Sequence, residues 1–118
     1  MPDRPASKTS LVALFQALSD ATRLAVIERL SIGPASVTEL ARPFDMALPS
    51  FMQHLSVLER AGIVMSHKSG RSRVFQLVPN ALDPAAAWLT SARSHWDRRL
   101  DQLDQMLLTS SEPDKDQR

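Results

Sequence analysis

The stretch from Ser36 to Leu77 constrains the fold of this chain more than any other part of the sequence. It contains two short segments with apolar residues at helical spacing, separated by Pro43, which cannot continue a helix. Two runs of alternating polar and apolar residues follow, one on either side of Gly70, and this pattern predicts a β-hairpin. We therefore expect a mainly α protein with a small β-hairpin: a winged helix-turn-helix of about five helices and a two-stranded wing.

Apolar spacing and helix-breaking residues give the expected bounds of the helices. They are expected at about Ser10–Leu18, Ala21–Leu30, a short segment introduced by Ser36 and ended by Pro43, Ala47–Arg60, and about Leu82–Leu108. Residues 1–8 and 109–118 are polar and rich in proline, serine and charge, so we expect two disordered tails. Residues 9–108 are then a single domain.

The composition excludes several classes of protein. Cysteine is absent, so the chain forms no disulfide and no thiolate metal site. No apolar run approaches the roughly 20 residues that cross a bilayer, and residues 1–8 lack the apolar core of a secretion signal. A glycine-rich phosphate loop and an acid pair near a histidine at catalytic spacing are also missing. We expect a cytoplasmic protein that is not an enzyme, has no cofactor and binds no membrane.

Positive charge is concentrated in the middle of the chain, although the net charge is only +1. Residues 42–81 hold five basic and two acidic residues, a net charge of +3, whereas residues 82–118 carry −2 and residues 1–41 are neutral. Charge gathered on the helix-turn-helix and the hairpin is typical of a nucleic-acid-binding protein. Three charges are few for binding at physiological salt, and a dimer doubles them.

The helix expected over Ala47–Arg60 carries polar side chains suited to reading bases in a DNA groove. Ser50, Gln53 and His54 lie toward its outer side, and glutamine is able to form two hydrogen bonds with adenine. The alternatives are a solvated helix face for Ser50 and Gln53 and a hydrogen bond to a nearby backbone carbonyl for His54.

Other candidate DNA contacts lie at the starts of the two helices. Leu48 either touches a thymine methyl group or packs in the core, and Pro49 is tolerated in the first turn of the same helix. Thr38 either contacts a phosphate or caps its own short helix.

The hairpin carries Lys68, Arg71 and Arg73 near its single glycine. A charge cluster is often only a solvated loop, but one at a hairpin tip beside a reading helix favours contacts with phosphates or the minor groove. Arg73 has Glu59 as an alternative partner. We expect affinity from the hairpin and selectivity from the helix.

Apolar residues recur at seven-residue intervals along the last helix, at Leu82, Leu89, Trp96 and Leu103. So long a seam cannot all be buried against a small core, so part of it is expected to contact a partner subunit. The expected dimerisation residues are Leu11, Leu14, Leu89, Trp96, Leu100, Leu103 and Leu107. Trp88 and Trp96 either line an inducer pocket between subunits or pack in the dimer and the core.

Four segments of the chain resemble the ArsR family of bacterial winged helix-turn-helix repressors. They are FQALSDATRLAVIERL at residues 15–30, VTELA at 37–41, HLSVLERAGIV at 54–64 and GRSRVFQL at 70–77, and the resemblance spans residues 11–107. It implies a homodimer that represses transcription at a partly palindromic DNA operator. It also implies release of the operator when an inducer binds, here a small molecule of unknown identity.

The chain departs from the pattern of the family it resembles. Met52 stands where the family usually has serine or threonine, so the operator is expected to differ from those of better-known members. Metal-sensing members carry a cysteine motif where residues 40–44 offer no ligand, or acid and histidine pairs on the last helix, which here has only His95. His67 and His95 are too isolated for zinc, which needs three or four ligands. The chain thus looks like the branch without the known metal sites.

The alternative function is a protein-interaction module without its own operator.

Overall fold

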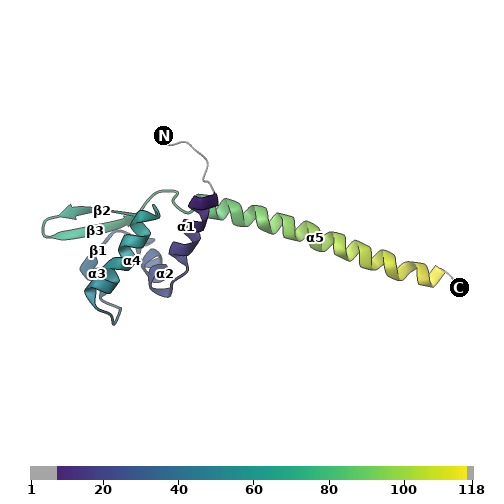
Figure 1. Ribbon diagram of the computed structural model, residues 1–118, viewed down its shortest axis with the longest axis horizontal. Helices are drawn as coiled ribbons and strands as arrows, with labels where there is room; N and C mark the ends of the chain where they lie inside the picture. Colours follow the sequence, from purple (N-terminus) through teal and green to yellow (C-terminus); the bar gives the residue numbers. More distant parts are fainter. Residues whose placement is uncertain (1–7, 117–118) are drawn as a thin grey trace. The chain divides into compact units, whose positions relative to one another are not determined.

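The computed structural model describes residues 8–116, which form five helices and three strands. In chain order they are α1 (Lys8–Leu18), α2 (Ala21–Leu30), β1 (Ala35–Ser36), α3 (Val37–Ala41), α4 (Leu48–Arg60), β2 (Val64–Ser69), β3 (Ser72–Leu77) and α5 (Asp83–Asp116) (Figure 1). The chain divides into two compact units, Met1–Ala85 and Ala86–Arg118. The prediction of a mainly α winged helix-turn-helix is confirmed.

The three strands form one antiparallel sheet in the order β1-β3-β2. The hairpin pairs Val64 with Leu77 at one end and Ser69 with Ser72 at the other, so its turn consists of Gly70 and Arg71 alone. Gly70 has a φ of 62°, and a glycine at the first turn position suits the tight two-residue hairpin. The third strand was not expected, because the two residues of β1 are too few to show an alternating pattern.

Side-chain caps fix where the first helices begin. Asp20 accepts a hydrogen bond from the backbone N–H of Arg23 at 3.0 Å and starts α2. Ser36 and Glu39 cap α3 reciprocally: the hydroxyl of Ser36 accepts from the N–H of Glu39, and the Glu39 carboxylate accepts from the N–H of Ser36. These caps place the short α3 directly after β1.

The end of α4 determines where the hairpin starts. Gly62 adopts a φ of 78°, and its N–H donates to the carbonyl of Glu59 at 3.0 Å. The next N–H, of Ile63, reaches back to the carbonyl of Leu58 at 3.0 Å, and both of those apolar side chains are buried. This Schellman arrangement satisfies the last carbonyls of α4 and turns the chain into β2.

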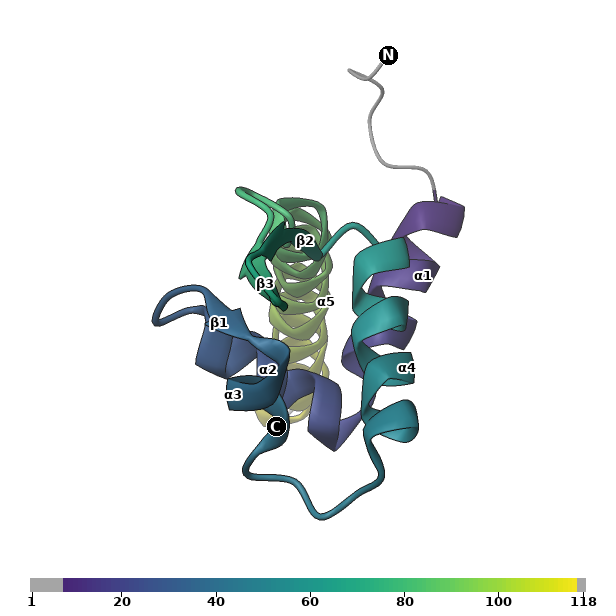
Figure 2. The same ribbon diagram turned by 90° about the vertical axis from the view of Figure 1, so that its left-hand side faces the viewer.

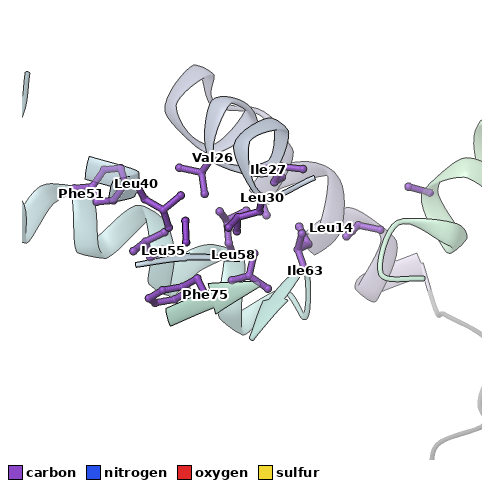
Figure 3. Close-up of a cluster of buried hydrophobic side chains, with 14 residues drawn as sticks. Leu14, Val26, Ile27, Leu30, Leu40, Phe51, Leu55, Leu58, Ile63 and Phe75 are labelled. Atoms are coloured by element: carbon purple, nitrogen blue, oxygen red, sulfur yellow. The ribbon is translucent and has the colours of Figure 1, made fainter. Parts of the chain in front are cut away.

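The core of the first unit lies between the helices and one face of the sheet. α2 packs against both α4 and β3, and α4 also packs against β2 (Figure 2). Figure 3 shows side chains of these elements pointing toward one another. The buried residues are Leu14, Ala17, Val26, Ile27, Leu30, Ala35, Leu40, Phe51, Leu55, Leu58, Ile63, Val64, Phe75 and Ala85.

Two expectations about apolar residues are wrong. Leu14, expected at a subunit interface, is only 6% exposed and lies in the core of its own chain, because α1 turns this face toward α2. The spacing of Leu24, Ile27 and Leu30 in the sequence puts all three on the apolar side of α2 with Val26 at its margin, whereas in the structure Val26 is buried and Leu24 is 46% exposed. The bend of 93° between α1 and α2 sets which side of α2 meets the core, and spacing within one helix does not encode it.

α5 begins in the first unit, where Ala85 is buried, and forms the whole described part of the second unit. It is continuous through Asp116, beyond the expected end at Leu108 and into the segment expected to be a disordered tail. Pro84 is tolerated in the first turn of α5, the residues between it and Pro113 include neither glycine nor proline, and an established helix extends at little cost per residue. The expected N-terminal tail lies outside the described residues except for residue 8, as do residues 117–118 of the C-terminal one.

Within residues 8–116, no single helix is both long and apolar enough to span a membrane; only Ser10–Leu18 and Ala21–Leu30 taken together pass for length and composition, and they are bent by 93° at their break.

Candidate nucleic-acid interface

α4 presents a polar outer face because its apolar residues face the core. Phe51, Leu55 and Leu58 are buried, while Ser50 and Gln53 are exposed, as expected for residues that read a groove. α4 follows the extended loop of residues 42–47, seen at the bottom of Figure 2. The N-cap residue, Ala47, has no side chain able to accept a hydrogen bond from the first turn of α4. The backbone N–H groups of that turn therefore suit a phosphate oxygen.

The other candidates at the helix starts are also at the surface. Leu48 is 55% exposed, which excludes the alternative that it packs in the core. Pro49 occupies the first turn of α4 and is exposed. Thr38 is exposed in the first turn of α3, and since Ser36 caps that helix, Thr38 is not the cap.

His54 does not lie with Ser50 and Gln53 on the exposed face of α4. Its side chain is 23% exposed and turns toward the junction of α1 and α2, where its Nδ1 lies 3.0 Å from Nη1 of Arg23 and 3.6 Å from Oδ2 of Asp20. A guanidinium only donates hydrogen bonds, so Nδ1 is the acceptor and Nε2 carries the ring proton. The alternative was a partly buried histidine bonded to a backbone carbonyl. His54 is partly buried, but its partner is a side chain, brought close by the packing of α2 on α4.

Arg23 was missed in the sequence, although it belongs to the first matched segment. Its Nε donates to the carbonyl of Ala17 at 2.6 Å, and its Nη2 donates to the carbonyl of Gln16 at 3.2 Å. The hydrogen bond from the Arg23 backbone N–H is the main cause that lowers the pKa of the Asp20 carboxyl; burial opposes it, and the positive charge of Arg23 adds to the lowering. One side chain thus joins the last turn of α1 to α4, and the only sequence signal for it was an arginine three residues after a helix-capping aspartate.

The hairpin places its cations close together. Lys68 and Arg73 are direct cross-strand partners, and Arg71 occupies the turn; all three are exposed. Like charges directly opposite each other destabilise a hairpin, and a bound anion removes that penalty. The wing is therefore electrostatically suited to a phosphate backbone.

Arg73 reaches Glu59 only through a third residue. Nη1 of Arg73 donates to the hydroxyl of Ser66 at 2.9 Å, and that hydroxyl donates to Oε2 of Glu59 at 3.0 Å. The relay links both strands of the wing to the last turn of α4. Arg73 is therefore exposed beside Lys68 and also tied to α4 through Ser66, and its contact with DNA stays a prediction.

The histidines do not gather. His67 lies exposed on β2, while His95 lies on α5 with Nδ1 3.1 Å from Nη2 of Arg98. Across the described part of the chain, no three histidine, aspartate or glutamate side chains are grouped so that they could hold a metal ion.

The second unit is a helix with a long exposed apolar stripe. One side of α5 forms an open groove, whose lining residues include Trp88, His95, Trp96 and Leu103. The expected dimerisation residues of α5 are all exposed: Leu89, Trp96, Leu100, Leu103 and Leu107. Leu11, on α1, is partly buried. A single helix gains little stability in water, so this stripe calls for a covering surface.

Comparison with known proteins identifies relatives over most of the chain. A family model described as a helix-turn-helix domain matches residues 18–67. The HTH-type transcriptional regulator Rv2034 of Mycobacterium tuberculosis is 42% identical over 93 residues, which are 79% of this chain and 84% of that protein. The transcriptional repressor SdpR of Bacillus subtilis is 26% identical over 87 residues, 74% of this chain and 97% of SdpR. A crystal structure of an ArsR family transcriptional regulator is similar with a TM-score of 0.74 and 46% identity, and the match covers 80% of this chain and 97% of that one.

Proposed function

Because this chain belongs to the ArsR family of DNA-binding transcriptional regulators, we propose that it is a homodimeric repressor of its own or a neighbouring operon. The observation that carries the proposal is the combination of exposed polar residues on α4 with three clustered cations on the wing, whose strand β2 packs against α4. Its similarity to a named repressor, SdpR, supports the direction of regulation. Such a protein works where the chromosome is, in the cytoplasm.

Two groups of residues divide the work of binding double-stranded DNA. Lys68 and Arg71, with Arg73, contact phosphates and supply most of the affinity, since their charge acts on any sequence. Gln53 and Ser50 contact base edges in the major groove and supply selectivity. The remaining contacts come from Leu48 and Pro49 at the start of α4, Thr38 on α3 and Nε2 of His54.

The dimer forms through α5. The exposed stripe that contains Leu89, Trp96 and Leu103 packs against the same stripe of a second copy, with Leu11 of α1 at its margin. Two copies then set their α4 helices into successive major grooves about 34 Å apart. The net charge of +3 on residues 42–81 is doubled in the dimer, which compensates for the modest charge of one chain.

Release of the operator follows the binding of a small-molecule inducer, for which the groove beside Trp88 and Trp96 is the candidate location. In the dimer, the grooves of the two copies face each other across the interface. An apolar ligand fits between them only if Trp88 and Trp96 leave part of that space unfilled. The inducer is thus tied to the interface, and its binding is expected to change the spacing of the two α4 helices.

The test begins with selection of bound sites from a random duplex pool at low salt. Arg71→Ala should weaken binding to all duplexes and reduce the slope of log affinity against log salt by about one, because the variant makes one phosphate interaction fewer. Gln53→Ala should relax discrimination at one base step by about 1–3 kcal/mol and leave the salt slope unchanged.

Both variants are compared with Arg93→Ala, which removes an exposed cation from α5 instead of the wing. Only Gln53→Ala is expected to weaken binding to selected DNA more than to random DNA. If both variants lose the same affinity for selected and random DNA, the assignment of affinity to the wing and selectivity to α4 is wrong. If the wild-type protein binds no duplex, the proposed regulator function is wrong and the alternative, a protein-interaction module, is favoured.

A further inference from the structure

Three large apolar side chains at the start of α4 are exposed and close in sequence. Met46 precedes the helix, Leu48 is its first residue, and Met52 lies one turn later. Leu48 is 55% exposed and the two methionines 36% each. Residues four apart in a helix are neighbours on its surface, so Leu48 and Met52 form one continuous apolar edge.

The apolar edge and the polar residues proposed to read bases share the first two turns of α4. Gln53 follows Met52 by one residue and Ser50 follows Leu48 by two, so both are offset around the helix from the apolar edge, and both sets are exposed at the start of α4. A single exposed apolar side chain is ordinary on a protein surface, but three within seven residues at the tip of a reading helix form a patch that water solvates poorly. The surrounding residues 42–81 carry a net charge of +3, which favours an anionic partner such as DNA.

We propose, on the basis of the function proposed above, that the apolar edge reads thymine methyl groups in the operator half-site. The C5-methyl of thymine is the only apolar group that a base pair displays in the major groove. At the same position cytosine presents an N–H donor nearby, which Leu48 or Met52 would desolvate without offering an acceptor. Thymine is therefore selected both by contact and by exclusion.

Helix geometry gives the spacing of the two thymines. Four residues separate Leu48 from Met52, a rise of about 6 Å along the helix axis. Neighbouring bases on one strand are about 3.4 Å apart. The two side chains thus meet thymines one or two steps apart, and Gln53 reads an adenine beside them through two hydrogen bonds.

The decisive experiment removes the methyl groups from the DNA and leaves everything else in place. In the duplex selected by the wild-type protein, each thymine of a half-site is replaced in turn by deoxyuridine, which keeps the base pair but lacks the C5-methyl. Binding is measured by fluorescence anisotropy. At two positions, one or two steps apart, the wild-type protein should lose about fourfold in affinity, the effect of one buried methyl group.

The protein variants assign each position to a side chain. Leu48→Ala should bind the thymine and deoxyuridine duplexes equally at one position, and Met52→Ala should do so at the other. Gln53→Ala should keep both methyl effects. Ile32→Ala, which removes an 82% exposed apolar side chain after α2, is the matched control and should behave as the wild-type protein. Both edge residues are partly exposed, so Leu48→Ala and Met52→Ala should stay folded at the temperature of the binding assay, which circular dichroism checks before the affinities are compared.

Three results would overturn the proposal, and they are distinguishable. A selected half-site without thymines, or a duplex whose affinity is unchanged by deoxyuridine at every position, sinks the thymine proposal and leaves the regulator function standing. Equal methyl effects in the wild-type, Leu48→Ala and Met52→Ala proteins assign the methyl contact to other residues. Failure to bind any duplex overturns the proposed function itself.

Discussion

Arg23 shows how one side chain holds several helices in register. Its guanidinium donates to two carbonyls in the last turn of α1 and to Nδ1 of His54 on α4. The last carbonyls of a helix have no partner within it, and they carry the negative end of its dipole. A planar cation with several donors in fixed directions satisfies them better than any other side chain.

Replacing Arg23 with alanine is expected to lower the free energy of unfolding by about 1–3 kcal/mol, since a hydrogen-bonded charged group is removed and its acceptors stay unpaired. Arg23→Lys should recover part of this stability, because it keeps the charge at the end of α1 without the planar geometry. Urea unfolding followed by circular dichroism measures both. An unchanged midpoint for Arg23→Ala would mean that these hydrogen bonds contribute nothing to stability.

Gly62 permits a different residue-scale test. Its φ of 78° is disfavoured for residues with a Cβ, yet no atom lies within 4 Å of where that Cβ would stand. The cost of Gly62→Ala is thus conformational alone, about 1–2 kcal/mol of stability. Gly33→Ala is the matched control, because its surroundings are equally open and its φ is not in the left-handed region; it should be neutral or slightly stabilising. Equal effects in thermal unfolding would contradict the role of the left-handed turn.

At the scale of the elements, helix caps make stability depend on pH. The pKa of Asp20 is lowered by its hydrogen bond from the Arg23 N–H, and that of Glu39 by its hydrogen bonds with Ser36. A carboxyl with a lowered pKa in the folded state stabilises above its ordinary pKa of about 4. That contribution disappears as the pH falls through the folded-state pKa. The chain should therefore lose stability on the acid side.

The pH test uses Asp20→Asn, because asparagine caps a helix about as well as aspartate but does not titrate. Between roughly pH 5 and pH 2 the urea midpoint should fall less for Asp20→Asn than for the wild-type protein. Asp45→Asn, which changes an exposed acid in the loop before α4, should follow the wild-type curve. Parallel curves for all three proteins would exclude Asp20 as a source of the pH dependence.

How much of each element could be predicted from the sequence depends on the range of the interaction that fixes it. Local signals predicted α4 and the hairpin. Pro49 marks the start of α4, Gly62 its end and Gly70 the hairpin turn, and each of these features depends only on residues nearby in the sequence. β1 and the burial of Leu14 could not be predicted, since both depend on which distant element packs against them.

The candidate site follows the same rule. The exposure of Ser50, Gln53 and Lys68 could be predicted from helical spacing and from a position near the hairpin tip. The orientation of His54 could not, because its partner Arg23 lies 31 residues away and spacing within α4 carries no information about it. Helical spacing also could not decide whether Leu48 packs in the core or contacts DNA in the major groove, since an apolar residue suits both environments.

For the whole molecule, the exposed stripe of α5 is decisive. From residue 86 to residue 109 every described side chain is exposed except that of Ala92, which is partly buried. The stripe nevertheless contains two tryptophans and several leucines. Such a helix is stabilised mainly by tertiary or quaternary packing. Covering it with a second copy both buries the stripe and joins two DNA-binding units.

Leu103→Glu should therefore separate the dimer, because it places a charge in the centre of the apolar stripe, where a buried unpaired charge is costly. Gln102→Glu, one residue earlier, adds the same charge outside the groove-lining residues and should stay dimeric. Sedimentation equilibrium distinguishes the two.

Binding to DNA provides a second test of the dimer. Inserting about 5 base pairs, half a helical turn, between the half-sites turns one of them to the opposite face of the duplex. The wild-type protein should then bind only as tightly as to one half-site, whereas Leu103→Glu should be insensitive to the insertion. A Leu103→Glu protein that stays dimeric, or a wild-type protein indifferent to the half-turn, would refute pairing through α5.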